Sequence, residues 1–336
     1  MANNSTVRGG GLDYGDEVVY LCDDDLSHFA TISAAFFILI FIFSVTGNSL
    51  LLCVVFRYED LKNVTNLFVL NLACSDLVFT VTLPFWAIYQ LHYWMFGDFA
   101  CKFLTAAYFA GYYSSIILLT AMTVDRFITV VLNNWPSKPV KRTRCAVGAC
   151  VAAWVISIAA SVSDVLNVSE QQDPHRCEAL LESSDINLSY YLQVSLLFFV
   201  PFAIIIFCYS AILKTVLQAS NRKRYRTVVV VLCIVAVFFI CWGPYNLFLF
   251  VETLYEPNTE CYAIKQSEIA YTIFRILAYS HCCMNPLLYM LSQKLRRHLM
   301  HILHCDNVKR RNRERATGNS AITPQNSAVM LELQIK

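Results

Sequence analysis

The stretch LLTAMTVDRFITVV, residues 118–131, sets two opposite charges, Asp125 and Arg126, side by side near the end of an apolar run. In a membrane each charge is expensive, because an ionisable group at the bilayer centre costs roughly 2.5–3.5 kcal/mol on insertion scales. The composition indicates a membrane: of 336 residues, 57% are hydrophobic and 15% are charged, and the mean hydropathy is +0.50. A soluble globular chain has about 25% charged residues. The depth and the partners of this pair therefore decide what the run does.

Seven apolar runs are long enough to cross a bilayer, for which about 20 residues in a helix suffice. They cover roughly residues 29–56, 64–91, 99–132, 145–166, 190–217, 226–255 and 268–290. The sequence therefore predicts an all-α membrane protein, a seven-transmembrane helix bundle over residues 29–290. A bundle tolerates prolines in its helices because neighbouring helices satisfy the freed backbone groups. The prolines that interrupt the spans are Pro84, Pro201, Pro244 and Pro286. We find no internal repeat, which argues against most transporter folds.

The charges outside the spans are segregated by loop. Lys and Arg gather after spans 3, 5 and 7, which places these segments in the cytoplasm and the N-terminus outside. The basic residues are Lys138, Lys141, Arg142, Arg144, Arg222, Lys223, Arg224, Arg226, Lys294, Arg296 and Arg297. Residues 1–28 form an acidic extracellular segment. They contain no apolar stretch, so we expect no cleavable signal peptide and take the first span as the insertion signal.

The outer loops carry two further marks of an extracellular position. Sequons for glycosylation begin at Asn3, Asn4, Asn167 and Asn187. Four cysteines also fall outside, in an oxidising compartment where disulfides are expected, and they allow three pairings. These cysteines are Cys22, Cys101, Cys177 and Cys261. No Cys or His spacing in the chain suits a zinc site.

Residues 291–304 repeat leucine and isoleucine at helical spacing opposite a basic face, which predicts an amphipathic helix on the inner leaflet. Cys305 follows directly and is a candidate for palmitoylation, with a free cytoplasmic thiol as the alternative. Residues 305–336 are polar and poor in aromatics, so we expect a disordered cytoplasmic tail.

Short motifs in successive spans resemble rhodopsin-like G protein-coupled receptors over roughly residues 30–305. They are GNSLL, NLACSDL, DRF, Trp154, Pro201 with Tyr209, CWGP and NPLLY. The motifs TLPFW, WMFGD and SHCCMNP and the four-cysteine layout resemble the chemokine receptors within that family. The segments SDLVF, YSSI, WGPYN and RILAYSHCC most resemble the lymphotactin (XC-type) receptors.

The resemblance implies a plasma-membrane receptor that is not an enzyme and binds no nucleic acid. It would bind a small basic, lymphotactin-like chemokine outside and activate a heterotrimeric G protein of Gi type inside, driving calcium flux and chemotaxis. Arrestin, receptor kinases and membrane lipid would be its other partners. The resemblance also implies disulfides between Cys101 and Cys177 and between Cys22 and Cys261.

For the opening pair, the resemblance implies an activation switch near the cytoplasmic end of span 3. Asp125 would hold Arg126 at rest, and on activation Arg126 would meet Tyr209, Tyr289 and the G protein. The alternative is a snorkelling pair at the membrane interface. The other switch residues would be Trp242, Pro244, Asn285 and Pro286.

Asp76 is a lone carboxylate in the middle of span 2, which is costly unless it is paired. The resemblance implies an allosteric sodium ion held by Asp76, Ser115 and Asn285. The alternative is a protonated, hydrogen-bonded aspartic acid.

The ligand site would have two parts. Tyr14 and Tyr20 lie among acids, as candidate sulfation sites that would help to capture a basic ligand by long-range attraction. The alternative is a solvated acidic tail. By position relative to the motifs, the pocket walls would be Trp86, Tyr108, Tyr112, Tyr245 and Tyr279, although an aromatic stripe can also be plain bundle core.

Arg275 lies eleven residues before Pro286, about three helical turns toward the outside. Many chemokine receptors carry Glu at the matching position, so here the charge is inverted. We expect Arg275 to donate to backbone carbonyls or an acid near the ligand N-terminus, whereas tyrosine hydroxyls would satisfy a structural arginine. Glu268 is on the same face but about 10 Å along the axis, too far for a direct pair without side-chain reach.

Four other functions compete with this prediction. An opsin needs a lysine midway along span 7, where only Lys265 lies nearby, before the span begins. A channel or transporter requires a path of polar groups through the spans, and few polar residues lie in mid-span here. An enzyme requires a motif such as a nucleophile with its base, and we find none in the sequence. The closest alternative is an atypical chemokine receptor that takes up ligand without G-protein signalling. Phe127, in place of the tyrosine usual in the family, favours it, whereas the intact Asp125–Arg126 and Asn285–Pro286 argue against it.

Overall fold

The computed structural model describes residues 26–132, 139–166, 168–172, 175–179, 195–218, 222–254 and 261–290, with residues 297, 298 and 300 beyond them. Most of the predicted helix 291–304 and the whole of segment 305–336 therefore lie outside the described residues. So do these predicted sites: Asn3, Asn4, Tyr14, Tyr20, Cys22, Asn167, Asn187 and Cys305.

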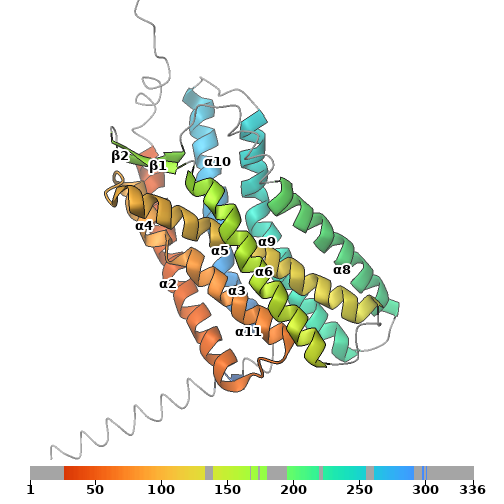
Figure 1. Ribbon diagram of the computed structural model, residues 1–336. Helices are drawn as coiled ribbons and strands as arrows, with labels where there is room; N and C mark the ends of the chain where they lie inside the picture. Colours follow the sequence, from red (N-terminus) through yellow and green to blue (C-terminus); the bar gives the residue numbers. More distant parts are fainter. Residues whose placement is uncertain are drawn as a thin grey trace, which may run out of the picture. The chain divides into compact units, whose positions relative to one another are not determined.

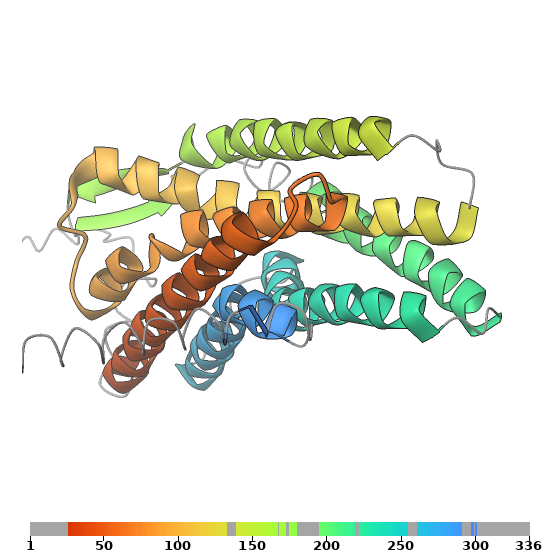
Figure 2. The same cartoon turned by 90° about the horizontal axis from the view of Figure 1, so that it is seen from below.

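Long helices form the seven predicted spans, and they lie side by side in one bundle (Figure 1, Figure 2). In chain order they are α2 (Leu26–Tyr58), α3 (Val64–Thr80) with α4 (Leu83–Leu91), α5 (Gly97–Phe127) with the π-helical η2 (Ile128–Leu132), α6 (Pro139–Leu166), η3 (Ser195–Phe199) with α8 (Val200–Gln218), α9 (Arg222–Leu254), and α10 (Cys261–Tyr279) with α11 (His281–Met290). Six of these spans are long and apolar enough to cross a membrane by themselves. The seventh, α10 with α11, is the most polar, because it carries Arg275, His281 and Asn285.

The helices extend past the apolar runs where charged residues continue the helical pattern. Helix α6 begins at Pro139 rather than at 145, and α9 begins at Arg222 rather than at 226. Two spans are broken within the bundle. Pro84 follows the break between α3 and α4 as an early residue of α4, and a turn at Ser280 separates α10 from α11. Proline is tolerated in the first turn of a helix, where its missing N–H would have no partner.

Helix α5 is the central helix and contacts α3, α6, α8 and α9. It approaches α3 closely at Gly111, where an added Cβ would lie 2.7 Å from the backbone nitrogen of Phe79. Polar side chains tie other helices together. Asn48 of α2 donates to the Cys282 carbonyl at 2.9 Å, and Trp154 of α6 donates to Asn71 of α3 at 3.1 Å. Large apolar side chains cover the outside of the bundle, as lipid contact requires.

A β hairpin caps one end of the bundle, formed by the antiparallel strands β1 (Val168–Gln172) and β2 (His175–Ala179) (Figure 1). The Cys101–Cys177 disulfide joins β2 to α5, which confirms that predicted bridge. The Trp94 amide also donates to the His175 carbonyl at 2.9 Å, and the Glu170 amide donates to Asp98 at 3.1 Å. The hairpin is therefore fixed to the start of α5 at several points.

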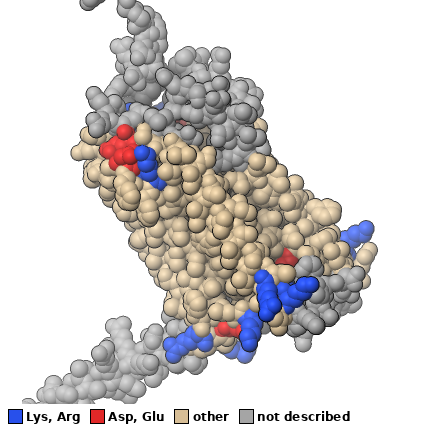
Figure 3. All heavy atoms as spheres, viewed as in Figure 1, with Lys and Arg blue, Asp and Glu red and all other residues tan. Residues whose placement is uncertain are grey.

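The charges agree with the predicted orientation. On the face shown in Figure 3, Lys and Arg gather at the end of the bundle opposite the hairpin. The described basic residues of that end include Arg57, Lys62, Lys141, Arg142 and Arg144, where α2 ends, α3 begins and α6 begins. The hairpin end is thus extracellular and the basic end cytoplasmic by the positive-inside rule.

Candidate functional site

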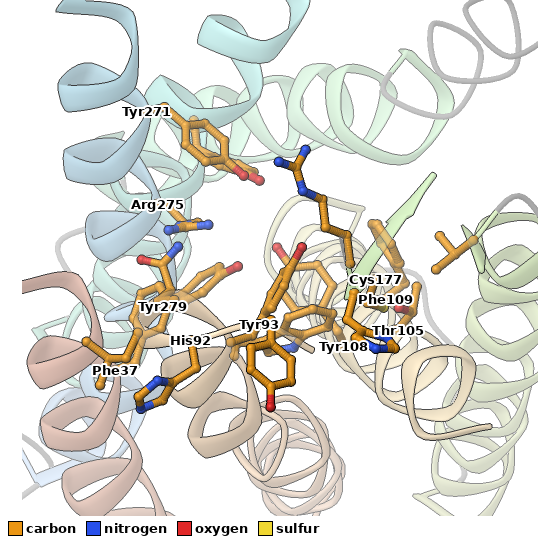
Figure 4. A pocket seen from close by; sticks show the side chains of 18 residues that line it. Phe37, His92, Tyr93, Thr105, Tyr108, Phe109, Cys177, Tyr271, Arg275 and Tyr279 are labelled. Carbon is orange, nitrogen blue, oxygen red and sulfur yellow. The ribbon is translucent and has the colours of Figure 1, made fainter. Parts of the chain in front are cut away.

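A cavity of about 900 Å³ lies at the hairpin end of the bundle. Side chains from α2, α4, α5, α9 and α10 line it together with strand β2 (Figure 4). Of the predicted walls, Trp86, Tyr108, Tyr245, Arg275 and Tyr279 line this cavity. Ligand sites are concave and mostly apolar with a few placed polar groups, which fits this lining. We call this space the outer cavity.

Arg275 points into the outer cavity between Tyr271 and Tyr279 (Figure 4). Its guanidinium carbon lies 4.8 Å from the ring centroid of Tyr271 and 5.2 Å from that of Phe37, within cation–π range. Its Nε is buried without a hydrogen-bond partner among the described residues. Arg275 is therefore positioned by aromatic rings and by the Tyr271 hydroxyl, while its Nε has no such partner.

The charge of the outer cavity has one sign. Among its described lining residues are Arg275, Arg176, His92 and His175, and none is Asp or Glu. Glu268, which the sequence also suggests as a ligand contact, is exposed on α10 and does not line this cavity, so its role stays a prediction. The outer cavity thus offers donors to an acceptor-rich ligand segment.

A second cavity of about 110 Å³, which we call the inner cavity, lies between α5, α6, η3 and α9. It is lined by Tyr112, a predicted pocket wall that does not line the outer cavity. It also contains Asp164 of α6, whose Oδ2 accepts a hydrogen bond from Tyr113 Oη at 3.1 Å. Asp164 was not predicted as a site residue, although an acid near the outer end of a predicted span was the signal that could have found it.

Trp242 lines the inner cavity and is 1% exposed. Its ring centroid lies 4.1 Å from that of Tyr112, 5.4 Å from that of His281 and 6.3 Å from that of Tyr279. Its indole Nε1 has no hydrogen-bond partner among the described residues. Packing therefore holds the Trp242 side chain between the inner cavity and His281, and its role as a switch stays a prediction.

Below Trp242, Asp76 is fully buried among polar groups from α11. Asn285 Nδ2 donates to Asp76 Oδ2 at 2.7 Å, and His281 Nε2 lies 3.4 Å from Asp76 Oδ1. Asp76 Oδ1 and Ser115 Oγ are buried without a hydrogen-bond partner among the described residues. These two oxygens fit a small cation, and His281 is a neighbour of the site that the predicted ligand set did not include.

At the cytoplasmic end, Asp125 has a partner that was not predicted from the sequence. Both carboxylate oxygens accept hydrogen bonds from Arg142 of α6, Oδ1 from Nε at 3.0 Å and Oδ2 from Nη2 at 2.7 Å. Adjacent residues of a helix point about 100° apart, so Asp125 faces α6 more readily than it faces Arg126. Arg126 donates to the Thr65 hydroxyl of α3, and the predicted hold of Asp125 on Arg126 stays a prediction.

Tyr209 of α8 also reaches this end of the bundle. Its buried hydroxyl lies near Thr123 and Arg126. Of the other predicted switch residues, Pro244 lies within α9 and Asn285 and Pro286 lie within α11. The side chain of Tyr289 lies outside the described side chains. The structure therefore brings Arg126 and Tyr209 together and leaves Tyr289 a prediction.

Comparison with known proteins gives the chain a family. The sequence profile described as "7 transmembrane receptor (rhodopsin family)" matches residues 47–289. The human protein named "Chemokine XC receptor 1" is 40% identical over 292 residues, covering 84% of each chain. Its mouse counterpart is 38% identical, covering 86% of this chain and 88% of the relative. Human "C-C chemokine receptor type 1" is 30% identical, covering 87% of this chain and 85% of the relative.

Proposed function

The chain belongs to the rhodopsin family of seven-transmembrane receptors and, within it, to the chemokine receptors, and from this we propose that it is an XC-type receptor for a lymphotactin-like chemokine. As a chemokine receptor it is a multi-pass protein of the plasma membrane and not an enzyme. Its general activities are chemokine binding and G-protein signalling. The proposal adds the ligand class, a Gi-type partner, and calcium flux and chemotaxis as the outputs.

The observation that carries the proposal is the position of Arg275 in the outer cavity. Its guanidinium is held by Tyr271 and Phe37 and keeps a buried Nε donor. A flexible peptide end with carbonyl or carboxylate oxygens supplies the acceptor that such a donor requires. Capture of the folded part of a basic chemokine would fall to the acidic residues 1–28, including Tyr14 and Tyr20, which keeps the two tasks on separate segments.

Signal transfer would run from the outer cavity through Trp242. Tyr279 lines the outer cavity beside Arg275, and its ring centroid lies 6.3 Å from that of Trp242. A ligand that displaces Tyr279 would change the packing around Trp242, two residues before Pro244, where α9 lacks one backbone hydrogen bond. Because cores are bistable rather than continuously deformable, a small shift there can swing the inner half of α9 outward.

At the inner end, Arg126 would be the group that the G protein reads. Tyr209 lies close to it on α8, and Tyr289 would be its second partner after the swing of α9. In the resting structure Arg142 engages the Asp125 carboxylate, and Arg126 donates to the Thr65 hydroxyl. Activation would exchange the Thr65 contact for one with the G protein. Arrestin and receptor kinases would act on the same cytoplasmic face, and a sodium ion at Asp76 and Ser115 would bias the resting state.

The test is a calcium-flux screen of cells that express this chain against a chemokine panel that includes lymphotactin. We expect a response to lymphotactin that pertussis toxin abolishes, since the toxin uncouples Gi-type proteins. Cells that express Arg126→Ala at the same surface level are the control. A response that survives the toxin would reject the Gi-type partner, and no response to lymphotactin alongside a response to another chemokine would reject the XC-type ligand.

The second candidate, ligand uptake without G-protein signalling, has one observation in its favour. Phe127 packs on Phe207 of α8 at 5.8 Å between ring centroids, where the usual tyrosine would present a hydroxyl. Internalisation of labelled lymphotactin without calcium flux or G-protein activation would establish that candidate. Phe127→Tyr tests whether the missing hydroxyl is responsible.

A further inference from the structure

The Asp125 carboxylate of α5 is engaged by a guanidinium group from another helix. Arg142 of α6 donates to both of its oxygens, and the Asp125 side chain is largely buried. A buried charge that loses its partner is strongly destabilising. Arg142 supplies a compensating charge to Asp125 that does not depend on where the Arg126 side chain lies.

The start of α6 is fixed by a contact that does not involve Arg126. Thr143, the residue after Arg142, donates from its hydroxyl to the backbone carbonyl of Lys62 at 2.9 Å. Lys62 lies just before α3, which begins at Val64. The beginnings of α6 and α3 are thus tied together, and Arg142 keeps its position when Arg126 changes partners.

The backbone that carries Asp125 and Arg126 is also fixed. The Thr129 hydroxyl donates to the Asp125 carbonyl at 2.9 Å and lies 3.1 Å from the Arg126 carbonyl oxygen, where α5 passes into η2. The side chain of Arg126 reaches away from this point to the Thr65 hydroxyl of α3. An exchange of partners at this end of the bundle therefore involves side chains rather than the backbone of α5.

These contacts bear on the free energy of activation. In the proposed function, Arg126 gives up its resting contacts and meets the G protein. With Arg142 in place, the Asp125 carboxylate keeps two charge-assisted hydrogen bonds after Arg126 has moved. A carboxylate that two guanidinium groups share also holds each of them less firmly, because the like charges repel. Both effects lower the free energy of the active state relative to the resting state.

We propose that Arg142 is a positioning residue for G-protein activation, which keeps Asp125 partnered while Arg126 is released and so sets the ligand-independent activity of the receptor. The proposal rests on the proposed function for the role of Arg126. It gives Arg142 a part in signalling beyond joining α5 to α6. Lysine at this position would keep the charge but lose the planar fork that matches both carboxylate oxygens.

The experiment measures guanine-nucleotide exchange without chemokine, on purified full-length receptor in nanodiscs with a purified heterotrimeric G protein of each class. Rates are compared at equal amounts of folded receptor. We expect Arg142→Gln to lower the basal exchange rate by about threefold or more, and Arg142→Lys to give a rate between those of Arg142→Gln and the wild type. Arg144→Gln removes an equal charge from an exposed position two residues later and should keep the wild-type rate.

A double-mutant cycle separates this role from a purely structural one. Asp125→Asn removes the charge that Arg142 compensates, so adding Arg142→Gln to it should change basal exchange by less than about twofold. Basal exchange of Arg142→Gln equal to or above that of the wild type, or an equal loss in both backgrounds, overturns the proposal. So does a wild type that drives no exchange above receptor-free nanodiscs. If Arg142→Gln gives no folded receptor, a wild-type rate for Arg142→Lys overturns it instead.

The chemokine screen tests the proposed function separately. A receptor that responds to a chemokine, but whose basal exchange does not depend on Arg142, refutes the role of Arg142 alone. A receptor whose basal exchange depends on Arg142 through Asp125, but which does not respond to lymphotactin, refutes the XC-type ligand alone.

Discussion

Arg142 of α6 holds Asp125 of α5 through two parallel hydrogen bonds of 3.0 and 2.7 Å. The Asp125 side chain is 15% exposed and that of Arg142 31%. A bidentate guanidinium–carboxylate pair of this kind is directional as well as strong. It joins the cytoplasmic ends of two helices that are connected through residues 128–138.

Loss of Arg142 should destabilise the bundle, because it leaves a largely buried carboxylate without its main partner. We expect Arg142→Ala to cost about 1–3 kcal/mol and to lower the melting temperature of purified receptor. Arg144→Ala removes an equal charge from an exposed position of the same helix and should have almost no effect. If the two variants have the same melting temperature, the Arg142–Asp125 pair stabilises the protein no more than an exposed charge does.

Arg126→Ala should abolish G-protein activation and leave ligand binding nearly intact. The reason is its position: Arg126 lies at the cytoplasmic end beside Thr65 and Tyr209, far along α5 from both cavities. Radioligand binding and nucleotide exchange on the G protein, measured on the same membranes, separate the two effects. Exchange equal to that of the wild type would show that Arg126 is not the switch.

Arg275→Gln and Arg275→Glu should reduce activation more than capture. Both remove the flat cation that lies against Tyr271 and Phe37, and Glu also reverses the charge facing the ligand. We expect at least about a tenfold loss of potency from the lost charged hydrogen bond, with a smaller change in affinity. Surface level, affinity and signalling are scored together. Wild-type potency of both variants would exclude a ligand contact, and failure of both to reach the surface would indicate a structural arginine.

Gly111→Ala should destabilise the contact between α3 and α5. An added Cβ would meet the Phe79 nitrogen at 2.7 Å, so the two helices must separate or tilt. Overpacking of this kind costs about 1–3 kcal/mol. Gly148→Ala in α6 is the matched control, because no atom lies within 4 Å of its added Cβ. Melting temperatures of the two variants test this, and a Gly111→Ala protein as stable as Gly148→Ala would contradict the close approach.

Deletion of residues 1–20 should slow ligand association. The association rate of the wild type should also fall as the salt concentration rises from roughly 50 to 300 mM, because the Debye screening length becomes shorter over that range. The physical reason is long-range attraction between the acidic segment and a basic chemokine. Surface plasmon resonance with lymphotactin measures both rates. An association rate insensitive to salt and to the deletion would leave the segment without a capture role.

The spans were predictable because a run of about 20 apolar residues has few alternatives to a transmembrane helix. The ends of the helices were less predictable, because α6 and α9 begin within basic segments that a hydropathy pattern does not include. The break at Ser280 was not predicted either, as it falls six residues before the proline that suggested a kink. These features depend on packing between helices rather than on local sequence.

The residues of the site were predictable where they lie near a family motif. They were not predictable where a side chain has its contact partner on another helix. Trp86, Tyr108 and Arg275 were placed in the outer cavity by their distance from motif residues, and they do line it. The partner of Asp125 could not be deduced, because Arg142 is seventeen residues away and meets it only when α6 packs against α5. Asp164 was obscure for the same reason, because only folding shows that it faces a cavity rather than lipid.

The Cys101–Cys177 bridge spans 76 residues of sequence, and this imposes an order on biosynthesis. At about 5–20 residues per second, the ribosome needs roughly 4 to 15 s to translate that interval. Cys101 is therefore made before its partner exists, and Cys22 is made earlier still. The correct bridge must therefore form late or replace an earlier one by exchange. A newly made receptor thus depends on the thiol–disulfide chemistry of the secretory pathway before its outer cavity has a complete wall.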